Sequence, residues 1–166
     1  VYWPAFLMAA DLPLPKRVYA HGWGTNEGQK ISKSLGNVID PITLTAQYGL
    51  DQTRYFLMRE VPFGNDGDFS AIAMTHRMNG DLANDLGNLC QRVLSMIFKN
   101  CDGLMPEIPA KPVEADRKLL LAADGLLDQV RDLLERQAFN DALRVIWQVV
   151  SDANRYIDSS APWALK

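Results

Sequence analysis

The sequence predicts a mainly α-helical fold, in which an antiparallel helical bundle follows an incomplete α/β segment. After about residue 70, apolar residues recur every three or four positions over three long stretches, a spacing typical of amphipathic helices that share a core. Before that point, short apolar runs alternate with turns rich in Gly and Pro. That first part is too short to complete an α/β domain, so we expect a partial α/β unit joined to a bundle.

The first 40 residues are expected to form a helix, a strand and a loop. Trp3 to Ala10 predicts a short buried helix, whose first turn tolerates Pro4. Val18 to Trp23 is rich in aromatic and branched side chains and predicts a strand. Thr25 to Gly28 is a turn signal that can fold the chain back, which leaves Lys30 to Gly36 as a polar loop.

Two short helices are predicted in the middle of the chain. Asp40 and Pro41 are typical of a helix start, with Asp as the N-cap and Pro at the first helical position. Gly49 is typical of the end of that helix. Asp51 to Arg59 predicts the second helix, and Phe63 to Asp68 predicts a loop after it.

Three amphipathic helices are predicted beyond residue 70. The first begins near Ala71, the second spans Leu119 to Leu133, and the third spans Ala142 to Tyr156 before the Ala161 to Trp163 end signal. The linker Asp102 to Pro112, rich in Gly and Pro, separates the first helix from the second. The apolar stripe of the first helix consists of Met74, Met78, Leu82, Leu86, Leu89, Val93 and Ile97.

The composition excludes some classes of protein. The formal net charge is −3, so contact with nucleic acid must come from local basic groups and specific base contacts, and coating of DNA is not expected. The opening apolar run, Val1 to Ala10, is too short to span a bilayer, and we expect a cytoplasmic protein without a membrane partner.

Cys90 and Cys101 fit no metal-ligand spacing, so we expect buried thiols and no metal site. The start at Val1 is interpreted as a cut inside a larger protein.

Lys30 and Lys33 stand three residues apart in the predicted loop, and Ser32 and Ser34 flank Lys33. Two ammonium groups on a flexible loop can follow the phosphates of ATP, whose leaving pyrophosphate needs charge compensation mainly in the transition state. The preceding His-Gly pair can place an imidazole and a close backbone approach beside the same nucleotide. A solvated surface loop is the alternative interpretation of so short a motif. The candidate ATP-binding residues are His21, Gly22, Lys30, Ser32, Lys33 and Ser34.

A second set of polar residues follows one face of the first long helix. Asn84, Asn88 and Arg92 are spaced four apart, so they form a slanted polar stripe whose amides and guanidinium suit the edges of bases. Trp163, held by Pro162 at a helix end, is a candidate platform for stacking an unpaired base. Taken singly, the Asn and Arg residues could be merely solvated, and the Trp could belong to the core.

The string from His21 to Asn37, His-Gly-Trp-Gly-Thr-Asn-Glu-Gly-Gln-Lys-Ile-Ser-Lys-Ser-Leu-Gly-Asn, resembles the second signature region of the class I aminoacyl-tRNA synthetases. The usual form is Lys-Met-Ser-Lys-Ser, and Ile31 is an apolar replacement that keeps both lysines. Trp3 to Leu7, Asp51 to Leu57 and Phe63 to Ser70 resemble the flanking segments of methionine-specific members of this class.

Two further segments narrow the resemblance to the methionine-specific synthetases. Asn88 to Arg92 resembles their Asn-x-x-x-Arg element, and Asn154 to Trp163 resembles a second element that ends in Pro-Trp. In that family these groups read the CAU anticodon of tRNA(Met), with the Trp stacked on a base. The order of the motifs alone leaves leucine, isoleucine, valine and cysteine specificities open. The residues that the resemblance implies for the anticodon loop are Asn84, Asn88, Arg92, Pro162 and Trp163.

The resemblance also implies roles for the first part of the chain. Lys33 is expected to stabilise the transition state of amino-acid activation, with Lys30 assisting as the second catalytic lysine. His21 is expected near the adenosine of ATP, which would enter with Mg²⁺. Trp3 is expected near the amino-acid pocket, in its outer shell.

Three regions follow from the same resemblance. Residues 1–40 would be the end of a Rossmann-type catalytic domain, 41–72 a connecting segment that contacts the tRNA stem, and 73–166 an anticodon-binding bundle truncated at its C-terminal end. The first signature of the class, a His-x-Gly-His motif, is absent from this sequence. We therefore expect the parent protein to charge tRNA(Met) with methionine and the 166-residue chain alone to be inactive. A non-catalytic tRNA-binding module and a plain helical scaffold are the alternatives.

Overall fold

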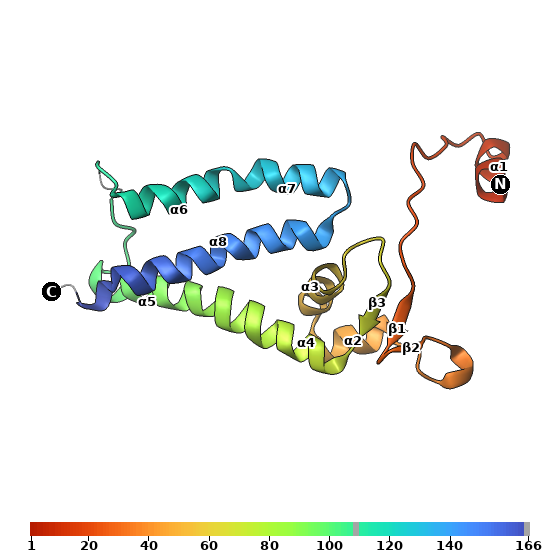
Figure 1. Cartoon of the computed structure of the whole chain (residues 1–166), viewed down its shortest axis with the longest axis horizontal. Helices are drawn as coiled ribbons and strands as arrows, with labels where there is room; N and C mark the ends of the chain where they lie inside the picture. The colour runs from red at the N-terminus through yellow and green to blue at the C-terminus, as the bar shows by residue number, and fades with distance from the viewer. Residues whose placement is uncertain (108–109, 165–166) are drawn as a thin grey trace.

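The computed structural model describes residues 1–107 and 110–164, which form a mainly helical protein with a small sheet. In Figure 1 the sheet and the short helices lie at one end, and the long helices run away from it. The strands are β1 (Gly24–Asn26), β2 (Gln29–Lys30) and β3 (Gly67–Phe69). The helices are α1 (Tyr2–Ala9), α2 (Pro41–Tyr48), α3 (Leu50–Glu60), α4 (Ala71–Arg77), α5 (Asn88–Asn100), α6 (Glu114–Asp124), α7 (Leu126–Glu135) and α8 (Phe139–Ser160), with the π-helical stretch η2 (Met78–Gly87) and the 3-10 helices η1 (Lys33–Leu35) and η3 (Pro162–Ala164).

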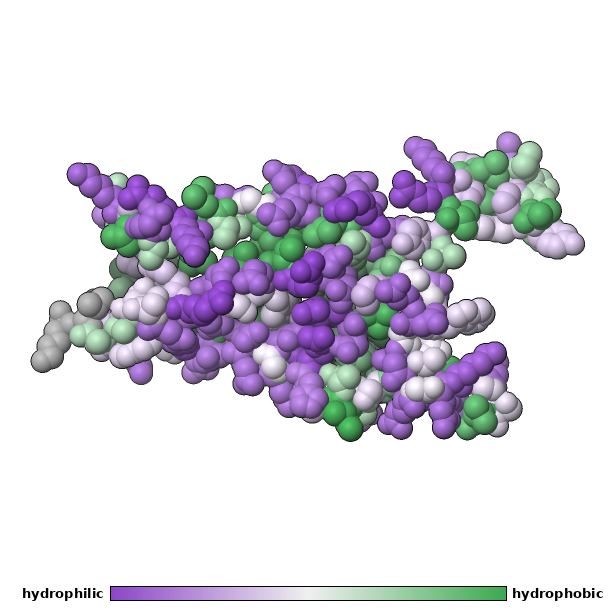
Figure 2. Space-filling view, viewed as in Figure 1, coloured by the Kyte–Doolittle hydropathy of each residue, from purple (hydrophilic) through white to green (hydrophobic). Residues whose placement is uncertain are grey.

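The helix predicted from Trp3 to Ala10 is present as α1, but it is not buried. None of its residues is buried, and its exposed apolar side chains include Trp3 and Phe6. In Figure 1 it stands apart from the other helices at the end of an extended segment, and Figure 2 shows apolar surface at this end. Within the described residues, α1 therefore has no apolar surface to pack against.

The sheet has the strand order β2-β1-β3, with β1 antiparallel to β2 and parallel to β3. The turn predicted from Thr25 to Gly28 is confirmed, because Glu27 and Gly28 connect β1 to β2. The strand predicted from Val18 to Trp23 is wrong, since pairing begins only at Gly24. A strand needs a neighbour for its backbone groups, and the Trp23 N–H donates to the Asp66 carboxylate at 2.7 Å instead.

The predicted loop from Phe63 to Asp68 is also partly wrong. Gly67 and Asp68 belong to β3, where they lie opposite Gly24 and Thr25. Three residues of pairing are too few to show the alternation of apolar and polar side chains by which a strand is recognised.

The helix boundaries in the middle of the chain are confirmed. Asp40 caps α2, because its Oδ1 accepts from the Ile42 N–H at 3.0 Å. Gly49 separates α2 from α3 at φ +96°, a value that glycine adopts most readily. α3 then buries Thr53 and Phe56 against the neighbouring elements.

The first long helix is continuous from α4 through η2 to α5, but its middle is not α-helical. Met78–Gly87 forms a π-helix, whose hydrogen bonds span five residues and whose turn is wider. Two backbone carbonyls of this stretch accept bonds from α8: Trp147 Nε1 donates to Asp81 O, and Asn154 Nδ2 donates to Asp85 O, both at 3.1 Å. These bonds fasten η2 to α8.

Helix α8 lies between the long helix and α6–α7 (Figure 1). It runs antiparallel to α6 and α7 and parallel to the long helix, so consecutive helices alternate in direction. The predicted third helix is therefore confirmed, and the second is divided at Gly125, which has low helix propensity. The predicted linker falls between α5 and α6, and its residues 108–109 lie outside the described residues.

The core consists of a few buried side chains along these contacts. They are Leu44, Phe56, Met74, Ala142 and Ile157. Figure 2 shows apolar residues along the seam between α7 and α8 and mainly polar residues over α8. Across residues 1–107 and 110–164, no helix combines the length and the apolar character needed to cross a bilayer.

Candidate functional sites

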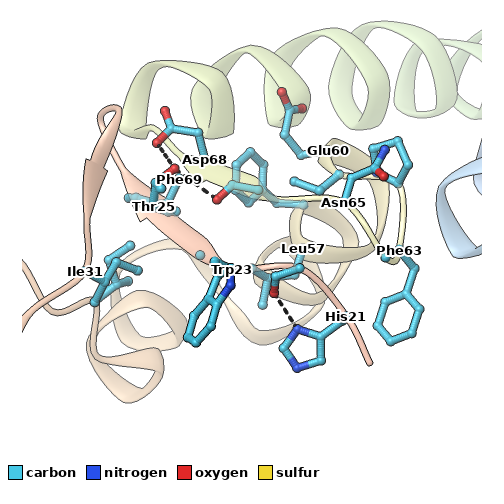
Figure 3. A pocket seen from close by; sticks show the side chains of 18 of the residues that line it. His21, Trp23, Thr25, Ile31, Leu57, Glu60, Phe63, Asn65, Asp68 and Phe69 are labelled. Atoms are coloured by element: carbon cyan, nitrogen blue, oxygen red, sulfur yellow. Dashed lines mark hydrogen bonds between the residues drawn. The ribbon is translucent and has the colours of Figure 1, made fainter. Parts of the chain in front are cut away.

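The first candidate site is a cavity of about 440 Å³ between the sheet, α3 and the segment that follows α3. In Figure 3 the ring of His21 lies beside that of Phe63, and Trp23 and Asn65 also line the cavity. The lining is mostly apolar and includes Phe56 and Leu57 from α3. The cavity can hold a flat, partly apolar group beside a few polar atoms.

His21 and Gly22 both line this cavity. The exposed imidazole of His21 has Nδ1 2.8 Å from the Gly22 carbonyl O, and its ring centroid lies 5.9 Å from that of Phe63. A Cβ on Gly22 would overlap the backbone of Asn65 and Asp66. Gly22 therefore allows its own backbone to lie close to that of Asn65 and Asp66. This contact shapes the rim of the cavity.

The lysine loop projects from the hairpin of β1 and β2. Lys30 ends β2 and Lys33 begins η1, and both side chains are exposed. Ser32 caps η1: its Oγ accepts from the Ser34 N–H at 3.3 Å and lies 2.7 Å from Ser34 Oγ. Neither lysine has an ion-pair partner within the described part of the chain. Both ammonium groups are therefore available to an anion.

The predicted ATP-binding residues are only partly brought together. Of the loop residues, Ile31 lines the cavity, whereas Lys30, Ser32, Lys33 and Ser34 do not. The two serine hydroxyls also bond to each other.

The second candidate site joins α5 to the end of α8. The guanidinium Cζ of Arg92 lies 5.4 Å from the ring centroid of Trp163, close enough for a cation–π contact. Arg92 Nη2 also bonds to Asp158 Oδ1 at 2.5 Å. Trp163 is 62% exposed and so is not a core residue. Pro162 begins η3, directly after Ala161 at φ +41°.

Asn84 and Asn88 are exposed on the same long helix as Arg92. Asn88 and Arg92 both lie in α5, where residues four apart share a face. Asn84 lies in the π-helical stretch, so the α-helical spacing that grouped it with the other two does not hold there. The structure thus brings Arg92 and Trp163 together. None of the hydrogen bonds among the described residues joins Asn84 to either of them.

Two residues that matter to these sites were assigned no role in the sequence. Asp158 pairs with Arg92, and Asp68 holds the hairpin that carries the lysine loop. The Asp68 Oδ1 accepts from the Gly28 N–H at 2.8 Å and from Thr25 Oγ1 at 2.7 Å. These two bonds lower the pKa of Asp68, the backbone bond from Gly28 contributing most. The role of Asp158 has no local sequence signal, because its partner Arg92 is 66 positions away.

The two cysteines are not buried as expected. Cys90, within α5, is exposed, and Cys101, which follows the last residue of α5, is half-buried. In the part of the chain that the structure describes, His, Cys, Asp and Glu side chains form no cluster of three that could hold a metal ion.

The chain resembles known proteins over its whole length. The family model for tRNA synthetases class I (M) matches residues 1–94. A methionine–tRNA ligase of Brucella suis is 59% identical over 166 residues, which are all of this chain and 32% of that protein. A methionine–tRNA ligase of Mycobacterium leprae is 53% identical over the same residues, which are 31% of its length. The chain thus spans about a third of the relatives that it matches.

Solved structures agree with these relatives. Mycobacterium tuberculosis methionyl-tRNA synthetase bound by methionyl-adenylate superposes with a TM-score of 0.90 at 53% identity, covering 99% of this chain and 32% of that one. The apo form of the same enzyme gives a TM-score of 0.86 at 50% identity, with 99% of this chain covered and 31% of that one. Because the family model matches more than half of the chain and these identities are high, the chain belongs to the methionyl branch of the class I tRNA synthetases.

Proposed function

We propose that this chain is the part of a methionine–tRNA ligase that supplies the ATP-facing lysine loop and the surface that reads the CAU anticodon. The whole ligase joins methionine to ATP, giving methionyl-adenylate and pyrophosphate, and then transfers the methionyl group to the 3′ end of tRNA(Met). One observation carries the proposal best: an exposed indole and a guanidinium from distant parts of the sequence meet at one surface.

The three regions have separate tasks in this proposal. Residues 1–40 complete a Rossmann-type catalytic domain, 41–72 connect it to the bundle and contact the tRNA stem, and 73–166 bind the anticodon. The small sheet with its cavity supports the first assignment, and the long helices with their exposed polar residues support the third. We propose that the ligase acts in the cytoplasm.

The lysine loop acts on the first reaction. ATP enters as its Mg²⁺ complex, and Lys33, with Lys30 assisting, neutralises the charge that develops on the leaving pyrophosphate. The exposure of both lysines supports this role, and among residues 1–107 and 110–164 neither must first leave an ion pair. His21 and Gly22 are proposed to contact the adenosine at the cavity. Ser32 and Ser34 shape the loop and can turn their hydroxyls to phosphate oxygens.

The Arg92–Trp163 surface acts on the anticodon. An unpaired base can stack on the exposed indole, while amide and guanidinium groups of Asn88 and Arg92 bond to base edges. Asn84 and Pro162 are proposed to complete this surface. Asp158 pairs with Arg92 beside the indole and so helps to hold the guanidinium in place.

Binding of anticodon stem-loops tests this proposal. A full-length ligase that contains the segment should bind a CAU stem-loop more tightly than a stem-loop with one base changed. Trp163→Ala should weaken CAU binding and slow tRNA charging while leaving adenylate formation unchanged. Equal binding of the two stem-loops would refute the assignment to methionine tRNA and favour another class I specificity.

Activation kinetics test the other half of the proposal. Lys33→Ala in the full-length ligase should slow methionine-dependent ATP–pyrophosphate exchange much more than it weakens methionine binding, since its contact strengthens in the transition state. An unchanged exchange rate would favour a tRNA-binding module without a catalytic loop. The 166-residue chain alone is expected to catalyse neither step. Methionine-dependent exchange by that chain would contradict this expectation.

A further inference from the structure

A single side chain, that of Asn37, joins the two ends of the lysine loop. Its Nδ2 donates to the carbonyl O of Lys30 at 3.1 Å, and its Oδ1 accepts from the backbone N–H of Ser32 at 2.8 Å. Asn26 adds a third bond, because its Nδ2 donates to the carbonyl O of Asn37 at 3.1 Å. Both halves of the Asn37 amide are therefore used across the base of the loop.

These bonds tie the loop to the sheet. Asn26 lies in β1, Lys30 lies in β2, and the two strands pair with each other. Asn37 is half-buried against them, although it belongs to the far end of the loop. The chain from Lys30 to Asn37 is thus closed into a ring by side-chain bonds rather than by a strand.

The hydrogen bonds that close this ring are made by Lys30 itself and by Ser32, the residue before Lys33. The carbonyl of Lys30 is one of the bonded groups. The other bonded group is the N–H of Ser32, the residue that caps the 3-10 helix beginning with Lys33. Gly36 returns the chain at φ +66°, so that Asn37 can face back to Lys30.

We propose that Asn37 is a positioning residue for the two lysines: its amide fixes the backbone at Lys30 and Ser32, and so fixes where each lysine side chain leaves the loop. A lysine ammonium stands at the end of a flexible four-carbon stem. A small movement of the backbone that carries this stem displaces the ammonium by a larger distance. Because charge compensation depends on placing the ammonium in the transition state, loosening the base of the loop slows activation. This inference rests on the proposed function of the loop.

The test uses a full-length ligase that contains this segment and follows methionine-dependent ATP–pyrophosphate exchange. Asn37→Ala should lower kcat about tenfold, or roughly 1.4 kcal/mol of barrier, with an unchanged KM for methionine. In a Lys33→Ala background the same change should lower kcat clearly less than tenfold, since only the assisting ammonium of Lys30 is left to misplace. Asn79→Ala, the same change on the exposed side of η2, is the matched control and should leave kcat unchanged.

A second variant keeps the test decisive if Asn37→Ala prevents folding. Asn26→Ala removes only the third bond and should give a smaller fall in kcat, which should likewise shrink in the Lys33→Ala background. Falls that add to that of Lys33→Ala, or a loss of CAU stem-loop binding by the Asn37 variant, would overturn the positioning role. If Lys33→Ala slows exchange and neither asparagine variant does, the positioning role alone fails. If Lys33→Ala itself has no effect, the proposed function of the loop fails with it.

Discussion

The guanidinium of Arg92 lies over the indole of Trp163, with Cζ 5.4 Å from the ring centroid, although 71 positions separate the two residues in the sequence. Asp158 holds the guanidinium from another side. The indole remains 62% exposed despite this contact. One arginine is thus fixed between a carboxylate and an aromatic ring at a surface that is open to a ligand.

Arg92 and Trp163 should act as a coupled pair in anticodon binding. Each single change to Ala should weaken binding of a CAU stem-loop, the Trp163 change by about 1–3 kcal/mol if one base stacks there. The double variant should lose less than the sum of the two, because residues in contact couple by about 0.5–3 kcal/mol. Stem-loop affinities of the four proteins measure this coupling. Lys99→Ala, also on α5, should add to Trp163→Ala independently, and strict additivity of the Arg92 and Trp163 changes would contradict the prediction.

Much of the helical architecture could be predicted because its signals are local. Asp40 caps α2 through a bond to a residue two positions away, and Gly49 ends it through its own backbone freedom. The period of apolar residues likewise gives α8 its buried face, which includes Ala142 and Ile157. Each of these features needs only a short window of sequence.

The features that could not be predicted depend on partners far along the chain. β1 pairs with a strand more than forty positions away, so the run from Val18 to Trp23 gave no correct indication of where pairing begins. The π-helical stretch is bonded to Trp147 and Asn154 of α8, which lie 66 and 69 positions from their acceptors. Neither relationship leaves a periodic signal near the residues that it affects.

The candidate sites divide in the same way. Lys30 and Lys33 stand in one contiguous motif, and their exposure follows from it. The pairing of Arg92 with Asp158 and Trp163 joins residues 66 and 71 positions apart, and no local pattern in the sequence predicts these contacts. The functional residues can therefore be predicted from the sequence more readily than the contacts that hold them in place.

Gly22 should not tolerate a side chain. A Cβ at this position would overlap backbone atoms of Asn65 and Asp66, and backbone cannot move aside as cheaply as the end of a side chain. We expect Gly22→Ala to destabilise the chain by about 1–3 kcal/mol, measured by thermal unfolding. Gly80→Ala is the matched control, because a Cβ there meets nothing within 4 Å and alanine favours helix. If the Gly22→Ala variant and the unsubstituted chain are equally stable, the loop at Asn65 is free to move.

Asp68 should make the hairpin of the lysine loop sensitive to acid. Its pKa is lowered in the folded chain by the bonds from the Gly28 N–H and Thr25 Oγ1. A lowered pKa contributes stability above the unfolded value, near 3.9, and this contribution is lost as the pH falls through the folded value. Asp68→Asn should therefore reduce the dependence of unfolding temperature on pH below about 4. Asp116, whose pKa is also lowered, should account for part of the slope that remains.

A matched change distinguishes Asp68 from acidic residues in general. Asp124→Asn, on the exposed surface of α6, should leave the acid dependence of the parent intact. If both variants have the same slope below pH 4, the bonds from Gly28 and Thr25 do not contribute to stability.

Tyr55 should make the chain lose stability in alkali. Its hydroxyl donates to Asp81 Oδ2 at 2.6 Å, and its ring centroid lies 4.6 Å from that of Trp147. Burial, followed by the bond to the Asp81 carboxylate, raises the pKa of Tyr55 well above its ordinary value of 10.0. A raised pKa contributes stability that is complete below the unfolded value and is lost as the pH rises toward the folded value. Stability should therefore fall above about pH 10.

Tyr55→Phe should separate the hydrogen bond from the ring. At neutral pH the variant should be less stable by about 1–2 kcal/mol, because the Asp81 carboxylate loses one donor while the ring contact with Trp147 remains. Above pH 10 its stability should fall less steeply than that of the parent. Tyr2→Phe, at an exposed position of α1, should keep the alkaline slope of the parent. Denaturant unfolding at pH 7 and pH 10.5 measures both effects, and a Tyr55→Phe variant that retained the full alkaline slope would exclude Tyr55 as its source, leaving Tyr156, whose pKa is also raised.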